Sequence, residues 1–229
     1  MLVWTDRIEG TIGGGALEWR AMHIARDMLA KGATSSDCTI PLGPDLGQCC
    51  GGAVSLTFKV VAEDEADPAG RPLWIWGAGH VGRALVAAFA PLPDFTVTWI
   101  DTAQDRFPGD LPATVMPVTS ADMPRLAAHA PRDAGHLIVT YSHEIDLALC
   151  HALLTRGFAH CGLIGSATKW ARFRSRLSAL GHDQAAITRI ACPIGDPSLG
   201  KHPQAIAIGV AAALLRPGAG VRRGKDMTG

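Results

Sequence analysis

The sequence predicts an α/β protein whose C-terminal part is a Rossmann-type parallel sheet flanked by helices, preceded by a small α+β domain. Two observations support this prediction. After residue 72, short apolar runs alternate with helical segments, which is typical of βαβ units and a mostly parallel sheet. The first of these runs leads into a glycine-rich turn and then a helix, which is the order of a dinucleotide-binding βαβ unit.

A polar stretch separates two blocks of the chain. Residues 63–72 are first acidic and then rich in Pro and Gly, a composition typical of an exposed linker. The sequence therefore predicts a small N-terminal domain over 1–62 and a Rossmann-type domain over 73–216. The Gly- and Arg-rich residues 217–229 are predicted to form a disordered tail.

The periodicity of apolar residues predicts the individual elements. In the first block the predicted elements are strands at Leu2–Thr5 and Gly10–Ile12, a helix over 16–31, and a strand at Ala53–Val61. In the second block the predicted strands are Leu73–Trp76, Thr96–Ile100, Thr114–Met116, His136–Thr140 and His160–Ile164. The predicted helices there are Val81–Ala90, Ala121–Ala130, Ile145–Arg156, Ala167–Leu180 and Pro203–Leu215. Cys150 and Cys161 lie in apolar patterns and are predicted core residues.

Composition excludes several classes of protein. The 229 residues carry 21 Lys and Arg against 21 Asp and Glu, and this zero net charge argues against a nucleic-acid binder. The longest apolar stretch, Ala205–Leu215, is about half of a membrane span, and the N-terminus lacks a signal-peptide pattern. The six cysteines show neither a CxxC pair nor zinc-ligand spacing. We therefore expect a cytoplasmic protein with reduced thiols and no membrane partner.

The turn from Gly77 to Gly82 is the first candidate binding site. Gly77 permits a tight turn, Gly79 lets backbone N–H groups approach a phosphate, and Gly82 lets the helix pack on the strand. His80 lies within the same turn. Asp101 ends the next strand, where a carboxylate can accept ribose hydroxyls and repel a 2′-phosphate. NAD is one ligand that fits this pattern, and a Rossmann fold that has lost its nucleotide site is the alternative.

A second glycine cluster precedes the first helix. Gly13, Gly14 and Gly15 are unsuited to the interior of a helix or strand. They suit a backbone nest at a helix N-terminus, which is an anion site, and a flexible turn fits them equally well.

The adjacent cysteines Cys49 and Cys50 form the most unusual segment. Flanking glycines leave the thiols accessible and supply free backbone N–H groups that can lower a thiolate pKa. A soft thiolate suits a soft metal or persulfide chemistry, so both residues are candidate catalytic and metal-binding residues. The alternative is one buried cysteine and one idle cysteine.

Two loops link later strands to helices, where Rossmann-like sheets bind their ligands. In the first loop, His143 is a candidate acid or base; the alternative is that it is a solvated or structural histidine. Ser142 in the same loop is a predicted helix cap. In the second, Ser166 can cap the helix, and Lys169 and free N–H groups can meet an anion.

Taken together, these segments resemble the XdhC family, the xanthine dehydrogenase accessory proteins related to CoxI. The matching stretches follow the order of the family and cover nearly the whole chain: 10–18, 48–52, 73–82, 163–173 and 192–215. Family members usually carry a further N-terminal segment, so the resemblance implies a shortened first domain. That shortening is either a natural short form or a start placed too late.

The resemblance implies a non-catalytic or weakly catalytic accessory role. It implies that the protein binds molybdenum cofactor (molybdopterin), supports its sulfuration and inserts it into xanthine dehydrogenase. The implied partners are the molybdenum subunit of the dehydrogenase and a cysteine desulfurase, and a homodimer is left open. An NAD-dependent oxidoreductase with His143 as base and a nucleotide-sensing module remain the alternatives from other classes.

Overall fold

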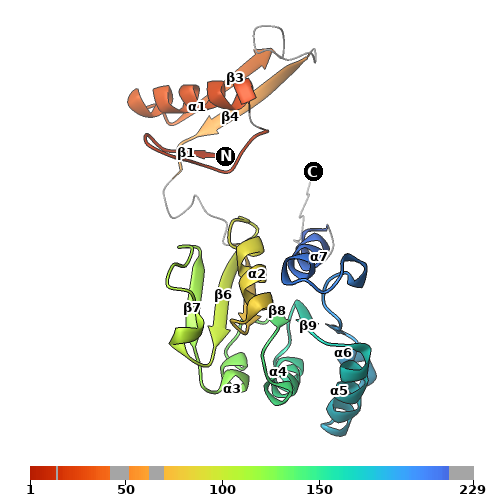
Figure 1. Ribbon diagram of the computed structural model, residues 1–229. Helices are drawn as coiled ribbons and strands as arrows, with labels where there is room; N and C mark the ends of the chain where they lie inside the picture. Colours follow the sequence, from red (N-terminus) through yellow and green to blue (C-terminus); the bar gives the residue numbers. More distant parts are fainter. Residues whose placement is uncertain (14, 42–51, 62–69, 217–229) are drawn as a thin grey trace. The chain divides into compact units, whose positions relative to one another are not determined.

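The computed structural model describes residues 1–13, 15–41, 52–61 and 70–216 (Figure 1). The chain divides into two compact units, Met1–Pro68 and Ala69–Gly229, and each is considered by itself. Three predicted site residues, Gly14, Cys49 and Cys50, lie outside the described residues. The same holds for the predicted tail and for residues 63–69 of the predicted linker.

The N-terminal unit combines one helix with two small antiparallel sheets. Its helix α1 spans Gly15–Ala30. The strands are β1 (Leu2–Val3) paired with β2 (Ile8–Glu9), and β3 (Ser35–Pro41) paired with β4 (Ala53–Lys59). Ala21 and Met28 are buried, as their helical spacing predicts.

Two details of this unit differ from the sequence prediction. The predicted strand at Gly10–Ile12 is wrong, because β2 ends at Glu9 and Gly10 adopts the left-handed region at φ +69°. Strand β3 was not predicted at all. Only one of its residues, Ile40, is buried, and a strand exposed on most positions carries little apolar alternation.

The C-terminal unit contains a six-stranded, entirely parallel sheet, which confirms the predicted fold class. Its strands, in chain order, are β5 (Arg71–Trp76), β6 (Phe95–Asp101), β7 (Val115–Thr119), β8 (Gly135–Ile138), β9 (His160–Leu163) and β10 (Ile190–Ala191). Their spatial order is β10-β9-β8-β5-β6-β7, so the chain runs outward from β5 to one edge and then from β8 to the other. This is the strand order of a Rossmann fold.

Helices cover both faces of the sheet. They are α2 (His80–Phe89), α3 (Met123–Ala127), α4 (His143–Arg156), α5 (Ala167–Ala179), α6 (Gln184–Ile187) and α7 (Pro203–Leu215), with short 3₁₀ turns η2 (Gln104–Arg106) and η3 (Pro197–Leu199). Helices α2 and α7 lie side by side (Figure 1) and pack with Leu73 and Ile75 of β5. Helices α3, α4 and α5 pack on the opposite face, with Trp76. Burial on both faces explains why the strands are continuous apolar runs.

A crevice is expected where the strand order reverses, between β5 and β8. The register pairs Trp76 with Ile138, so Gly77 follows β5 directly beside Val139, which follows β8. The backbone N–H of Val139 donates to the carbonyl of Trp76 at 2.9 Å. The loops after β5 and β8 therefore leave the sheet together at its carboxyl edge.

The imidazole of His136 makes the stability of this unit pH-dependent. The residue is 0% exposed in β8, and its Nδ1 accepts the Trp76 Nε1–H at 3.3 Å, which requires a neutral ring. Burial, helped by His160, lowers the pKa of His136 to about 3. The unfolded chain, with a pKa of about 6.5, therefore binds this proton first as the pH falls. Stability is complete above about pH 6.5 and declines by about 1.4 kcal/mol per pH unit toward pH 3.

We expect urea unfolding at pH 7.5 and pH 5.0 to show this loss in the native protein. The His136→Gln variant keeps an acceptor for Trp76 but has no ring to protonate, so its stability should change less between the two pH values. Some pH dependence should remain, because burial also lowers the pKa of His160. An equal loss in both proteins would contradict the assignment to His136.

Candidate functional site

The glycine turn after β5 is held by backbone contacts at two of its three glycines. A Cβ on Gly77, which has φ +115°, would lie 2.6 Å from the carbonyl oxygen of Val139. A Cβ on Gly82 would lie 1.9 Å from the carbonyl oxygen of Gly77. At Gly79, by contrast, a Cβ would meet no atom within 4 Å. Gly79 therefore leaves an open cradle, whereas Gly77 and Gly82 are required by the fold.

Helix α2 begins at this turn without a side-chain cap. Gly79 is its N-cap residue and has no side chain to accept from the first turn. Helices α4 and α5 differ, because Ser142 and Ser166 accept the N–H groups of Ile145 and Lys169 at 3.4 and 3.2 Å. These bonds confirm the capping roles predicted for both serines. Unlike those of α4 and α5, the N-terminal N–H groups of α2 are therefore left available to an anion.

Asp101, at the end of β6, is engaged by the protein itself. Its side chain is 1% exposed. Its Oδ2 accepts the backbone N–H of Ala78 at 2.5 Å, and its Oδ1 accepts the N–H and hydroxyl of Thr102 at 2.6 and 3.1 Å. Oδ1 also lies 2.8 Å from Nε of Arg106, which makes an ion pair. Asp101 therefore ties the glycine turn to the segment after β6.

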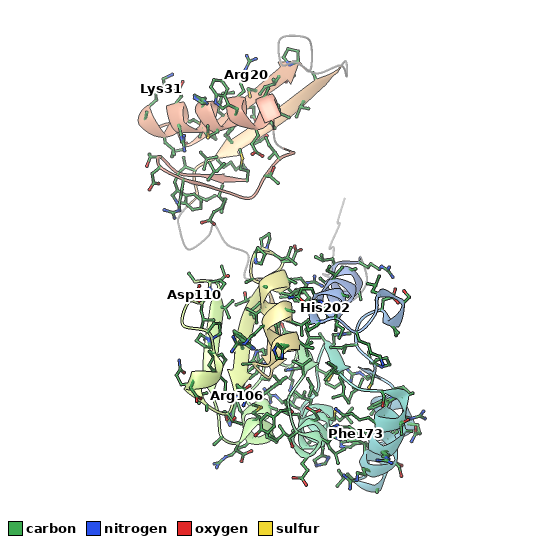
Figure 2. The ribbon with its side chains drawn as sticks, in the orientation of Figure 1. Arg20, Lys31, Arg106, Asp110, Phe173 and His202 are labelled. Atoms are coloured by element: carbon green, nitrogen blue, oxygen red, sulfur yellow. The ribbon has the colours of Figure 1, made fainter. Side chains whose placement is uncertain are left out.

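Arg106 lies close to the start of α2 (Figure 2) and lines a cavity of about 260 Å³. The cavity is lined by the glycine turn and by the loops after β6, β8 and β9; its lining residues include Gly79, His80, Asp101, Arg106, Tyr141 and Ile164. The Arg106 guanidinium lies over the Tyr141 ring, 4.9 Å from its centroid. Arg83 of α2 donates to the carbonyl oxygens of Arg106 and Ala78 at 2.8 and 3.2 Å, which fixes this backbone.

A second polar cluster lies at the carboxyl ends of β8 and β9. Asp146 is fully buried and accepts the Thr140 hydroxyl at 2.6 Å and the Lys169 ammonium at 2.5 Å. The ammonium also donates to the carbonyl of Ile164 at 2.9 Å. The predicted anion contact of Lys169 stays a prediction, and the structure gives this side chain a buried carboxylate as its partner.

His143 is the first residue of α4 and is exposed. Its ring meets that of Phe173 edge to face, with ring centroids 6.4 Å apart. Its predicted acid or base role stays a prediction.

The thiols of the C-terminal unit are protonated at neutral pH. Cys150 and Cys161 are 0% exposed, as predicted for core residues, and burial raises the pKa of both thiols. Cys192 is half-buried, and burial raises the pKa of its thiol to about 11, although nearby Lys169 opposes the shift. These cysteines lack the thiolate character of a reactive residue.

A carboxylate of α1 contacts the residues that directly precede the glycine cluster. Glu18 accepts the backbone N–H of Ile12 at 3.0 Å and the hydroxyl of Thr11. Gly13 and Gly15 have positive φ angles of +117° and +67°, and a Cβ at either position would meet no atom within 4 Å. The loop therefore binds an internal anion, and its binding to a cofactor stays a prediction.

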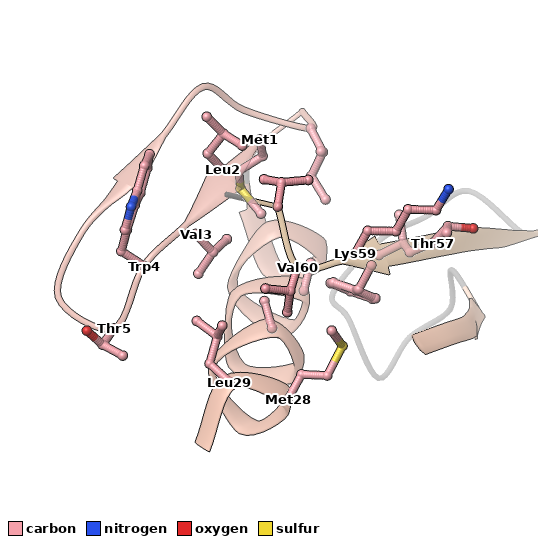
Figure 3. Close-up of a pocket in the computed structure, with 16 residues that line it drawn as sticks. Met1, Leu2, Val3, Trp4, Thr5, Met28, Leu29, Thr57, Lys59 and Val60 are labelled. Atoms are coloured by element: carbon pink, nitrogen blue, oxygen red, sulfur yellow. The ribbon is translucent and has the colours of Figure 1, made fainter. Parts of the chain in front are cut away.

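The N-terminal unit also contains an apolar cavity of about 550 Å³ between β1, α1 and the end of β4 (Figure 3). Its described lining includes Val3, Met28, Leu29 and Val60, with Lys59 as the ionisable side chain among these described residues. The described lining offers no combination of acid, base and thiol, so it indicates chemistry less strongly than the crevice of the C-terminal unit does.

Arg106, Arg83 and Tyr141 were not assigned roles from the sequence. Arg106 lies five positions after Asp101, and an arginine close to the end of this strand is a known signal for a 2′-phosphate. Nothing in the local sequence links Tyr141 to Arg106. Within the described residues, no group of three His, Cys, Asp or Glu side chains is placed to hold a metal ion. No helix among those residues is long and apolar enough to cross a membrane.

Family models match both units. A model described as the XdhC Rossmann domain matches residues 73–214, and a model of the XdhC and CoxI family matches residues 1–39. The Uncharacterized protein YqeB of Escherichia coli (strain K12) is 29% identical over 227 residues, which cover 94% of this chain and 40% of YqeB. The chain thus spans well under half the length of this relative.

One solved structure shares the fold, and a second matches more weakly. One is described as a xanthine dehydrogenase from Bacillus halodurans; it is 18% identical, has a TM-score of 0.53, and covers 87% of this chain and 63% of its own. This likeness supports the fold alone. The other is a myo-inositol dehydrogenase from Corynebacterium glutamicum ATCC 13032, which is 14% identical with a TM-score of 0.40 over 55% of this chain and 36% of its own. Its similarity is too low to carry an argument.

Proposed function

The chain belongs to the XdhC family, and from this premise we propose that it is an accessory protein of xanthine dehydrogenase maturation. In this role it binds molybdenum cofactor, supports its sulfuration and inserts it into the dehydrogenase. It acts in the cytoplasm as a maturation factor rather than as an enzyme with turnover. Its proposed partners are the molybdenum subunit of the dehydrogenase and a cysteine desulfurase.

One observation carries this proposal most directly: the uncapped start of α2, which faces a cavity bordered by Arg106. Molybdopterin carries a phosphate, and a phosphate is favoured by the N–H groups and dipole of a helix N-terminus. The open space at Gly79 fits such a group, because no protein atom fills the position of a Cβ there. The residues present therefore fit the phosphate end of this cofactor.

Each proposed residue has a distinct task. Gly77, Gly79, His80 and Gly82 form the turn that receives the phosphate, while Asp101 holds that turn through the Ala78 N–H. When bound, the cofactor supplies a molybdenum–dithiolene centre. Cys49 and Cys50, which lie outside the described residues, are the proposed thiols for metal contact and for accepting sulfur from the desulfurase.

Within the C-terminal unit, Ser166 and Lys169 at the start of α5 are proposed as further cofactor contacts. Within the N-terminal unit, Gly13, Gly14 and Gly15 are proposed as a cofactor-binding backbone nest. The exposed His143 is proposed as a proton carrier.

The experiment is a pterin-retention assay on the full chain. We expect protein purified after exposure to molybdenum cofactor to release a fluorescent oxidised pterin, and we expect it to increase activation of apo-xanthine dehydrogenase. Cys49→Ser or Cys50→Ser should reduce dehydrogenase activation about tenfold or more if that thiol handles sulfur, since Ser lacks the soft nucleophile. Cys38→Ser is the matched control, because Cys38 is a free, half-buried cysteine of β3.

Two results would contradict the proposal. The first is absence of retained pterin together with unchanged dehydrogenase activity when the protein is omitted. The second is full activation by a variant lacking both Cys49 and Cys50, which would remove the sulfuration role while leaving cofactor binding testable by retention alone.

A further inference from the structure

We infer that the crevice at α2 selects a phosphate monoester attached to a planar fused heterocycle, with Arg106 as the anion contact and Tyr141 as the stacking surface. This inference deepens the proposed function and rests on it for the identification of this crevice as the ligand site. Neither residue is part of the glycine turn, so the inference adds a specificity determinant that the turn alone lacks.

Asp101 is not free to accept ribose hydroxyls. Its two oxygens already receive the N–H of Ala78, the N–H and hydroxyl of Thr102, and the charge of Arg106. A dinucleotide read through its ribose diol needs a carboxylate at this position that is open to the ligand. Here a diol would have to displace contacts that also hold the glycine turn, and recognition through the diol is therefore disfavoured.

The Arg106 guanidinium pairs with the Asp101 carboxylate through its Nε, and not through the two parallel hydrogen bonds of a bidentate pair. Among the described residues, neither terminal nitrogen of Arg106 donates a hydrogen bond to the protein. The Arg106 side chain is 38% exposed and lines the cavity. A fork of free N–H donors at this place matches two oxygens of a phosphate.

The charged groups beside the glycine turn favour an anion. Arg83 and Arg106 lie beside the turn with Asp101, and Arg83 is held there by its bonds to the carbonyls of Ala78 and Arg106. Two cations against one carboxylate leave a net positive charge, to which the N-terminus of α2 adds its own positive dipole end. A monoester dianion gains more from this field than the single charge of a diester does.

Tyr141, three residues after the end of β8, is 65% exposed, and the Arg106 guanidinium lies over its ring. An exposed aromatic ring beside a planar guanidinium is a surface on which heterocyclic rings stack. The cavity of about 260 Å³ is smaller than the roughly 300–1,000 Å³ of sites that enclose a whole ligand. It is therefore sized for one end of a larger molecule.

Two sources share this chemistry: a pterin phosphate such as molybdopterin, and a 2′-phosphoadenosine group such as that of NADPH. The experiment measures binding of matched pairs to the full chain by calorimetry. One pair is the oxidised pterin of molybdopterin with and without its phosphate. The other pair is adenosine 2′-monophosphate and adenosine, followed by NADPH and NADH.

We expect at least one phosphorylated member to bind about tenfold or more tightly than its partner, and the pair that shows this preference identifies the source. Arg106→Gln should remove most of that preference, a loss of about 10–100-fold for the phosphorylated ligand. Arg106→Lys should recover part of it, because the charge returns without the fork. Tyr141→Ala should weaken both members of the pair equally, and Tyr141→Phe should match the native protein. Arg172→Gln, on the exposed face of α5, is the matched control.

Equal binding of both members of every pair would overturn the inference, as would a preference that survives Arg106→Gln. Stronger binding of NADH than NADPH would also overturn it, because that order requires recognition of the ribose diol. These outcomes are separable from failure of the proposed function. A preference confined to the adenosine pair, with no pterin retention, rejects the maturation role and keeps the phosphate subsite.

Discussion

Gly82→Ala is expected to destabilise the C-terminal unit by about 3 kcal/mol, at the upper end of the range for overpacked sites. The new Cβ would lie 1.9 Å from the carbonyl oxygen of Gly77 and 3.4 Å from Nε1 of Trp99. That carbonyl already accepts the Trp99 Nε1–H at 3.0 Å, so neither group can move without losing a buried hydrogen bond. Urea unfolding followed by tryptophan fluorescence measures the loss.

Gly79→Ala provides the contrast within the same turn. Gly79 has φ −74° and ψ −173°, extended backbone that any residue adopts, and no atom lies within 4 Å of its added Cβ. We expect its free energy of unfolding to change by less than about 0.5 kcal/mol, as for an ordinary surface substitution. Its affinity for the phosphorylated ligand should fall about tenfold or more, because the methyl group fills the cradle. Gly109→Ala, which also enters open space, is the control.

The two variants together separate folding from binding. If Gly79→Ala bound the ligand as well as the native protein does, the α2 N-terminus would not be the phosphate site. If the Gly82→Ala variant had the same urea midpoint of unfolding as the native protein, the close packing of α2 against the turn would not contribute to stability as described.

The second large expected effect is the loss of stability when the buried ion pair between Lys169 and Asp146 is broken. Lys169→Met should lower stability by about 3–5 kcal/mol, since it leaves a buried carboxylate without its cation. Asp146 is 0% exposed and Lys169 is 10% exposed, so water cannot replace the lost partner. The double variant Asp146→Leu with Lys169→Met removes both charges and should recover most of the loss.

Arg172→Met is the matched control on the same helix, because Arg172 is exposed. Its unfolding midpoint in urea should equal that of the native protein. A Lys169→Met variant as stable as this control would show that the pair contributes nothing. A double variant less stable than Lys169→Met would show that the hydrogen bond from Thr140 to Asp146, at 2.6 Å, contributes more to stability than charge compensation does.

Local sequence predicted most elements of the C-terminal unit well. Helix α7 has the predicted bounds, Pro203–Leu215, and α5 ends one residue earlier than predicted. The elements that were missed are short: β10 has two residues and α6 has four. Elements of this length show no full apolar period, so a pattern argument cannot detect them.

Some features of the candidate site follow from local sequence, and others depend on contacts between distant parts of the chain. The glycine turn, the strand-terminal Asp101 and the serine caps depend on residues close in sequence, and the sequence placed them correctly on strands, turns and helices. The local sequence did not predict which groups these residues bind in the folded protein. Asp101 meets Ala78 across 23 positions, and Lys169 meets Asp146 across another 23, because parallel strands bring their carboxyl ends together only in the folded sheet.

The fold class, the turn that can receive a phosphate, and the family resemblance all follow from residue types at fixed spacing along the chain. Which groups at that turn are available to a ligand depends instead on the folded structure. It showed that Asp101 is engaged within the protein and that Arg106 and Tyr141 border the cavity. The reason is physical: spacing specifies local geometry, whereas the availability of a polar group depends on every neighbour that folding brings within hydrogen-bonding distance.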